Sequence, residues 1–191
     1  SYVDKQYQIK VMCDASFRGW GAIVHARLGG EEIGIHLQRR WREDESSLCA
    51  HSASAEPKAC HEALQWLIEK QFILKTTKVA IITDHHAIPN AQRDPKTGFG
   101  GVGYGYFLNK LFLTSNEYPG IHFFYVPGEQ NLADPLSRNQ LDKVGTTIKV
   151  TETPTAIPRL KSFYCRYAEE TRGDMDGENP DMTMGFVFTP E

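Results

Sequence analysis

The stretch that decides the fold is residues 8–37, QIKVMCDASFRGWGAIVHARLGGEEIGIHL. Over residues 8–14 polar and apolar side chains alternate, which is the period of a half-buried strand whose inner face carries Ile9, Val11 and Cys13. Two more strands are predicted over residues 21–26 and 33–37, with turns at Phe17-Arg18-Gly19 and Gly29-Gly30. Three short strands joined by tight turns predict an antiparallel meander.

The sequence that follows predicts helices alternating with two further strands. Residues 55–68 carry apolar side chains on one helical face. Residues 79–83 form a nearly continuous apolar run, typical of a central strand buried on both faces, and residues 121–126 predict the last strand. Shorter helices are expected over residues 87–93, 106–113 and about 132–141. This order predicts an α/β fold with a mixed five-stranded sheet, three antiparallel strands then two parallel ones, and helices on both faces.

The composition of the sequence changes after about residue 142. Prolines interrupt short apolar stretches there, and residues 169–181 are acidic and contain glycine. We expect residues 1–142 to form one domain and residues 143–191 to be a C-terminal extension or linker that packs on this domain or on a neighbouring one. The glycine-rich residues 94–105 are expected to form a loop, and they are not a P-loop because no Gly-Lys-Ser/Thr follows.

Composition excludes several classes of protein. No apolar run approaches the ~20 residues that a membrane-spanning helix needs, and the N-terminus has no signal-peptide pattern. The four cysteines form no CxxC pair, so buried thiols in an intracellular, non-secreted protein are expected. The net charge of −3 gives no overall attraction to nucleic acid. Binding to nucleic acid would therefore need local basic patches, metal ions or an attached partner.

Four acidic residues lie at the ends of predicted elements. Asp14 and Asp84 each end a strand, Glu56 lies in the first turn of the long helix, and Asp134 begins the last helix. Alone, each could be a cap or a turn former, but an open α/β sheet brings such positions together at one edge. Clustered carboxylates repel unless cations neutralise them, and Mg²⁺ or Mn²⁺ prefers such oxygen ligands. Two such ions could activate a water and stabilise the leaving oxygen in phosphodiester cleavage.

Several short segments resemble the motifs of one known family, the ribonuclease H domains of retroelement reverse transcriptases. They are Asp14-Ala15-Ser16 with Gly19-Trp20-Gly21-Ala22, Glu56 followed by Ala59, Ala63 and Leu64, Thr83-Asp84-His85, Tyr125-Val126-Pro127-Gly128, and Asn131-Leu132-Ala133-Asp134 with Leu136-Ser137-Arg138. The resemblance covers about residues 7–142. Within the family, these motifs are most similar to those of LTR or tyrosine-recombinase retrotransposons and of hepadnavirus-like polymerases.

The resemblance implies a ribonuclease H-like fold and hydrolysis of the RNA strand of RNA–DNA hybrids. It implies two Mg²⁺ ions, with Mn²⁺ as a substitute, held by the catalytic residues Asp14, Glu56, Asp84 and Asp134. It further implies that the partners are the hybrid and a reverse transcriptase domain on the same polypeptide. The expected location is the cytoplasm, the nucleus or a virus-like particle.

Four further residues are expected to contact the substrate. Ser16 follows from the resemblance and Asn131 lies in the last motif, while Arg39 and Arg40 belong to the most basic patch, residues 39–42. That patch could equally be a solvated face with Trp41 in the core.

Two features favour the alternative of a catalytically weak or inactive scaffold or tethering module. Residues 128–131 lack the histidine that many family members carry before the last helix, and the net charge is negative. His85 and His86 suit a supporting or surface position better than a Mg²⁺ site.

Overall fold

The computed structural model describes residues 7–28, 31–46, 52–93, 105–138 and 183–190. Its elements, in chain order, are β1 (Ile9–Ala15), β2 (Gly19–Leu28), β3 (Glu31–Arg40), α2 (Ser52–Glu69), β4 (Val79–Thr83), α3 (Ala87–Arg93), α4 (Gly105–Glu117), β5 (Ile121–Tyr125), η2 (Gly128–Gln130), α5 (Asp134–Ser137) and β6 (Thr183–Pro190). The turn predicted at residues 29–30 and residues 94–104 of the predicted loop lie outside the described residues. Gly105, the last residue of the predicted loop, begins α4.

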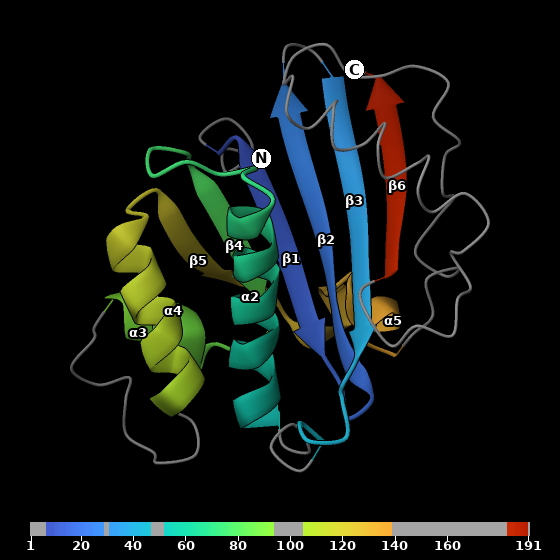
Figure 1. Ribbon diagram of the computed structural model, residues 1–191, viewed down its shortest axis with the longest axis vertical. Helices are drawn as coiled ribbons and strands as arrows, with labels where there is room; N and C mark the ends of the chain where they lie inside the picture. Colours follow the sequence, from blue (N-terminus) through green and yellow to red (C-terminus); the bar gives the residue numbers. More distant parts are fainter. Residues whose placement is uncertain (1–6, 29–30, 47–51, 94–104, 139–182, 191) are drawn as a thin grey trace.

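The strands form one mixed sheet in the order β5-β4-β1-β2-β3-β6 (Figure 1). β1, β2 and β3 pair antiparallel, while β4 runs parallel to both β1 and β5. The predicted five-stranded mixed sheet is therefore confirmed. β6, which belongs to the predicted C-terminal extension, adds a sixth strand by pairing antiparallel with β3.

Helices cover both faces of this sheet, as predicted. α2, α3 and α4 lie on the face turned to the viewer in Figure 1. The alternation in β1 sets this face, because Ile9, Val11 and Cys13 are at most 2% exposed and belong to the main core. On the other face, Leu136 of α5 packs in a smaller cluster with Ile23 of β2.

Three helices have bounds that differ from the prediction, and one of them is α4, which extends to Glu117 where the prediction ended at residue 113. α2 begins at Ser52, so Glu56 lies in its second turn and not in its first, and Pro57 lies inside the helix. Proline lacks the N–H that would bond to the preceding turn, so this part of α2 depends on its packing against the sheet. α5 begins at Asp134 and ends at Ser137, whereas a helix over about residues 132–141 was predicted. None of the described helices is long and apolar enough to cross a bilayer.

Candidate metal centre

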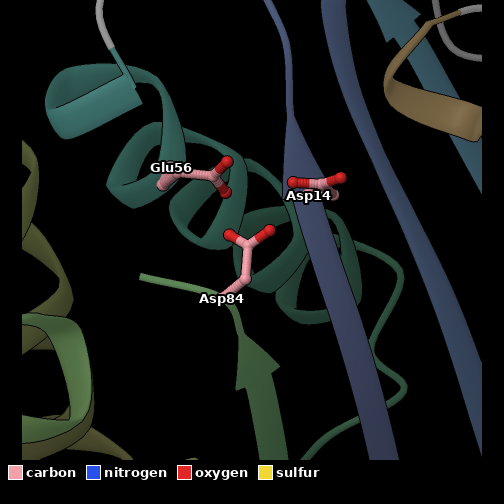
Figure 2. A group of neighbouring side chains, drawn as sticks. All are labelled: Asp14, Glu56 and Asp84. Atoms are coloured by element: carbon pink, nitrogen blue, oxygen red, sulfur yellow. The ribbon is translucent and has the colours of Figure 1, made fainter. Parts of the chain in front are cut away.

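Two parallel strands place Asp14 beside Asp84. Met12 of β1 is in register with Ile82 of β4, and each carboxylate lies two residues further along the chain, Asp14 within β1 and Asp84 directly after β4. Adjacent parallel strands end at the same edge of the sheet, so both acids come to that edge. α2 packs across β1 and brings Glu56 to the same place (Figure 2).

The three carboxylates meet closely. One ligand oxygen from each of Asp14, Glu56 and Asp84 lies within 4.8 Å of the other two, and Figure 2 shows the carboxylates pointing toward a common space. Asp14 is 4% exposed and Glu56 is 5% exposed, while Asp84 is half-buried. The structure therefore brings together three of the four acids that the sequence singled out, and it buries two of them.

The backbone of β1 supports two of these carboxylates, but one oxygen has no partner. The Ala15 amide donates to Oδ1 of Asp14 at 2.9 Å and to Oε1 of Glu56 at 3.3 Å. Oε2 of Glu56 is buried and has no hydrogen-bond partner among the described residues. A buried polar atom normally has one. An unpartnered carboxylate oxygen among clustered acids fits a hard cation that takes oxygen ligands.

The cluster raises the pKa values of both buried acids. Burial and the neighbouring Asp84 charge raise the pKa of Asp14 from 3.8 to about 7. Burial, then the charges of Asp14 and Asp84, raise the pKa of Glu56 from 4.5 to about 11. Desolvation and like charges both disfavour the ionised form. Without a cation the site therefore holds protons at neutral pH, and a divalent cation would have to displace them.

Asp134 lies apart from this group of three. It is the first residue of α5, and its carboxylate pairs with Arg138 at 3.3 Å, each side chain being 46% exposed. It still reaches Asp14, because a side-chain interaction with Asp134 contributes to the raised pKa of Asp14. Asp134 is therefore near enough to Asp14 to affect its pKa, and it could complete a second cation site.

The residues expected to contact substrate differ in accessibility. Arg40 is exposed, whereas the Arg39 side chain is 5% exposed and its guanidinium pairs with Glu45 at 2.8 Å. Ser16 donates its hydroxyl to the Ser137 carbonyl at 2.6 Å. Asn131 is buried; its amide group donates to the Cys13 carbonyl at 2.8 Å and its side-chain oxygen accepts from the Ala133 amide at 3.0 Å. Three of the four thus have internal partners, and a substrate contact for any of the four stays a prediction.

A cavity of about 400 Å³ opens beside the carboxylates. Glu56, Asp84, His85, His86 and Gly128 line it. Gly128 places the η2 loop next to this cavity, since a Cβ at this position would lie 3.5 Å from Oδ2 of Asp84, an ordinary contact distance. Gly128 belongs to one of the sequence motifs, but the sequence assigned it no role. The Ala15 amide could not be singled out from the sequence, because every residue except proline has a backbone N–H.

No family model matches the sequence, and no curated protein matches it. Solved structures with a similar chain path include the N-terminal ribonuclease H domain of Rv2228c from Mycobacterium tuberculosis, solved as a fusion with maltose-binding protein (TM-score 0.43, 15% identity, 71% of this chain and 94% of that chain). Ribonuclease H1 from Halobacterium salinarum gives a TM-score of 0.45 at 15% identity, covering 71% of this chain and 96% of that one. The foamy viral protease-reverse transcriptase solved with double-stranded DNA gives 0.39 at 12%, covering 63% of this chain and 24% of that one. Similarity at this level assigns no function, so the function is argued from this chain's own residues.

Proposed function

We propose that this chain is a metal-dependent endonuclease that hydrolyses the RNA strand of RNA–DNA hybrids. The observation that carries the proposal is the meeting of Asp14, Glu56 and Asp84 within 4.8 Å, with one buried Glu56 oxygen that has no hydrogen-bond partner in the described part of the chain. Such an arrangement is unfavourable unless a cation neutralises it, and the raised pKa values of Asp14 and Glu56 express that cost. Mg²⁺ is the proposed cofactor, with Mn²⁺ as a substitute, because both prefer carboxylate oxygens.

The chain's own residues have distinct roles in this proposal. Asp14 would contribute to both cation sites. Glu56 and Asp84 complete the first site, and Asp134 the second, after its carboxylate leaves Arg138. Bound there, two divalent ions would supply an acidified water and neutralise the charge on the leaving oxygen. The cavity beside Asp84 and Glu56 gives the scissile phosphate a place next to these ligands.

The proposed partner beyond the hybrid is a reverse transcriptase domain on the same polypeptide. A net charge of −3 leaves little general attraction to a polyanion, and affinity for nucleic acid depends largely on phosphate neutralisation. Arg39, one of the basic residues at the end of β3, is already paired with Glu45. A neighbouring domain would therefore supply most of the affinity.

The second candidate is a ribonuclease H-like scaffold with weak or no turnover, and the ion pair of Asp134 is the observation to weigh for it. Arg138 holds the Asp134 carboxylate at 3.3 Å, so the second cation must compete with an ion pair. Both side chains are 46% exposed, and exposed pairs of this kind contribute only about 0–1 kcal/mol. That competition is weak, which favours the enzyme over the scaffold.

The test is cleavage by the whole chain of four substrates: a hybrid labelled on RNA, the same hybrid labelled on DNA, duplex DNA and single-stranded RNA. The proposal predicts cuts in the RNA strand of the hybrid alone, with Mg²⁺ or Mn²⁺, and none with a chelator. Equal cleavage of duplex DNA would identify a DNA-cutting enzyme instead. No cleavage by the chain, even when fused to a reverse transcriptase domain, would favour the scaffold.

A further inference from the structure

Asp134 lies on a helix that is too short to hold its own place. α5 consists of four residues, Asp134–Ser137, and lies on the face of the sheet opposite to α2, which carries Glu56 (Figure 1). A single helical turn is not stable by itself in water. The position of the Asp134 carboxylate relative to Asp14 therefore depends on the contacts that tie α5 to the end of β1.

The side chain of Asn131 makes one such tie, with two hydrogen bonds. Its amide nitrogen donates to the carbonyl of Cys13, the residue directly before Asp14, at 2.8 Å. Its amide oxygen accepts from the backbone N–H of Ala133, the residue directly before Asp134, at 3.0 Å. Asn131 is 5% exposed, so both bonds are sheltered from water. One side chain therefore joins the two positions that precede the two acids.

The backbone beside Asn131 strengthens this tie. The Asp134 N–H donates to the Asn131 carbonyl at 3.2 Å, and the Leu132 N–H donates to Sδ of Met12 in β1 at 3.1 Å. The segment before α5 therefore contacts β1 at two successive residues, Met12 and Cys13, directly before Asp14 in the chain.

Ser16 ties the other end of α5 to the turn that follows β1. Its hydroxyl donates to the Ser137 carbonyl at 2.6 Å, and the Ser137 hydroxyl donates to the Asp134 carbonyl at 2.7 Å. Ser16 lies two residues after Asp14, and Cys13 lies one residue before it. Residues on either side of Asp14 therefore hold both ends of α5.

We propose that Asn131 is a positioning residue that holds the Asp134 carboxylate at the distance from Asp14 that the second divalent cation requires. It contacts neither the cation nor the substrate, and it acts through the backbone next to the two acids. Groups that orient metal ligands in this way commonly contribute about 10–100-fold to metal affinity or activity. This inference rests on the proposed function, since it assumes a second cation at Asp14 and Asp134. It replaces the substrate contact that the sequence predicted for Asn131.

The first test measures Mn²⁺ binding by the whole chain without nucleic acid, from the electron paramagnetic resonance signal of free Mn²⁺. The wild-type chain should bind two ions with unequal affinity, and Asn131→Ala should weaken the weaker site about tenfold or more. Asp134→Asn removes the ligand charge that Asn131 positions. In its presence Asn131→Ala should change Mn²⁺ binding less than about twofold, because residues that act as one unit are not additive.

The second test separates positioning from substrate contact by steady-state cleavage of a hybrid. Asn131→Ala should lower kcat about tenfold or more and change KM for the hybrid less than about twofold, because a metal ligand is displaced and no substrate contact is lost. A direct substrate contact would instead raise KM and leave Mn²⁺ binding without nucleic acid unchanged, which would overturn the proposal.

Gln92→Ala is the matched control for loss of structure. The Gln92 amide donates to the Ile121 carbonyl and accepts from the Phe123 N–H, both at 2.8 Å, so it makes the same two kinds of bond as Asn131. It makes them near the start of β5, the end of that strand away from the carboxylates. Gln92→Ala should lower the melting temperature as Asn131→Ala does, and it should change neither Mn²⁺ binding nor kcat.

Asn131→Ser covers the case in which Asn131→Ala does not fold. Its hydroxyl can still accept from the Ala133 N–H at the start of α5, but it is too short to replace the bond to Cys13. It should therefore weaken the same Mn²⁺ site. Thermal unfolding of each variant checks that it folds.

The proposal is overturned if the folded Asn131 variants leave Mn²⁺ binding unchanged, if Gln92→Ala weakens it equally, or if Asn131→Ala costs as much with Asp134→Asn as without it. A wild-type chain with a single Mn²⁺ site would also overturn it, since no second cation would then need placing. Failure of the proposed function is distinct from these results. In that case the wild-type chain would bind two Mn²⁺ ions in an Asn131-dependent way and cut no hybrid.

Discussion

The backbone amide of Ala15 donates to Oε1 of Glu56 at 3.3 Å, and this hydrogen bond joins the end of β1 to α2. Ala15 directly follows Asp14, whose Oδ1 accepts from the same amide at 2.9 Å. One N–H therefore contacts two carboxylates that repel each other, which helps to hold them side by side. The remaining repulsion appears in the raised pKa values of Asp14 and Glu56.

Those pKa values predict how stability depends on pH and Mg²⁺. Both are higher in the folded chain than the ordinary 3.8 and 4.5, so folding takes up protons and stability falls as pH rises, through about 7 for Asp14 and toward about 11 for Glu56. From about pH 7 to about pH 9 without metal, the free energy of unfolding should fall by about 1 kcal/mol per pH unit because of Glu56. Mg²⁺ should raise the melting temperature more at the upper end of this range.

Glu56→Gln is the control for this prediction, because it should flatten the pH dependence and weaken the Mg²⁺ effect. His36 acts in the opposite direction, since burial lowers its pKa from 6.5 to about 4. Its effect is complete above its ordinary pKa, so it does not disturb the proposed range. A wild-type melting temperature that changed neither with pH nor with Mg²⁺ over this pH range would contradict the prediction.

The ion pairs beside α2 predict that replacing Glu45 lowers the stability of the chain more than replacing an exposed glutamate does. Glu45 accepts from Arg39 at 2.8 Å and pairs with Lys58 at 3.0 Å, and these charges together lower its pKa to about 2 despite its partial burial. Glu45→Gln should cost about 2 kcal/mol, because it removes one of the carboxylate charges that pair with two largely buried cations, Arg39 and Lys58. Denaturant unfolding measures the loss.

Glu117→Gln is the matched control. Glu117 pairs with Lys75 at 3.9 Å, with the two side chains 60% and 68% exposed, and its loss should cost less than about 0.5 kcal/mol. Equal effects for the two substitutions would show that the pairs around Glu45 do not stabilise the start of α2.

Gly21 allows α5 to pack closely against the sheet. A Cβ at Gly21 would collide with Leu136, whose backbone carbon would lie 2.7 Å away. Gly21→Ala should therefore push α5 off β2, lower stability by about 1–3 kcal/mol and displace Asp134, which reduces Mg²⁺-dependent activity. Unfolding and hybrid cleavage measure the two effects.

Gly105→Ala serves as the comparison, because a Cβ there would meet no atom of the described residues within 4 Å. It should leave stability and activity unchanged or raise stability slightly, since alanine favours a helix. If both glycine variants behaved alike, close packing of α5 would not be what places Asp134.

The sequence predicted what depends on local pattern and missed what depends on tertiary contacts. The alternation in β1 and the apolar run of β4 predicted two strands, and their shared edge predicted the meeting of Asp14 with Asp84. The start of α2 was predicted too late, because a proline at position 57 suggested a first turn.

Arg39 and Asn131 have tertiary contacts that the sequence did not predict. Arg39 pairs with Glu45 because the chain turns back between them, and Asn131 bonds to the Cys13 carbonyl 118 positions away. Nothing in the local sequence of either residue indicates such a partner. Pairing of β6 with β3 across most of the chain's length was likewise beyond the reach of sequence pattern.

The most direct test of the central claim is Mg²⁺-dependent cleavage of the RNA strand of a hybrid by the wild-type chain and by Asp84→Asn. The substitution keeps the size of a half-buried side chain and removes one ligand charge. We expect the wild-type chain to cut and the variant to lose at least about a hundredfold in rate, as removal of one essential charged group commonly costs 10²-fold or more. Cleavage that survived Asp84→Asn unchanged would contradict the assignment of the metal centre.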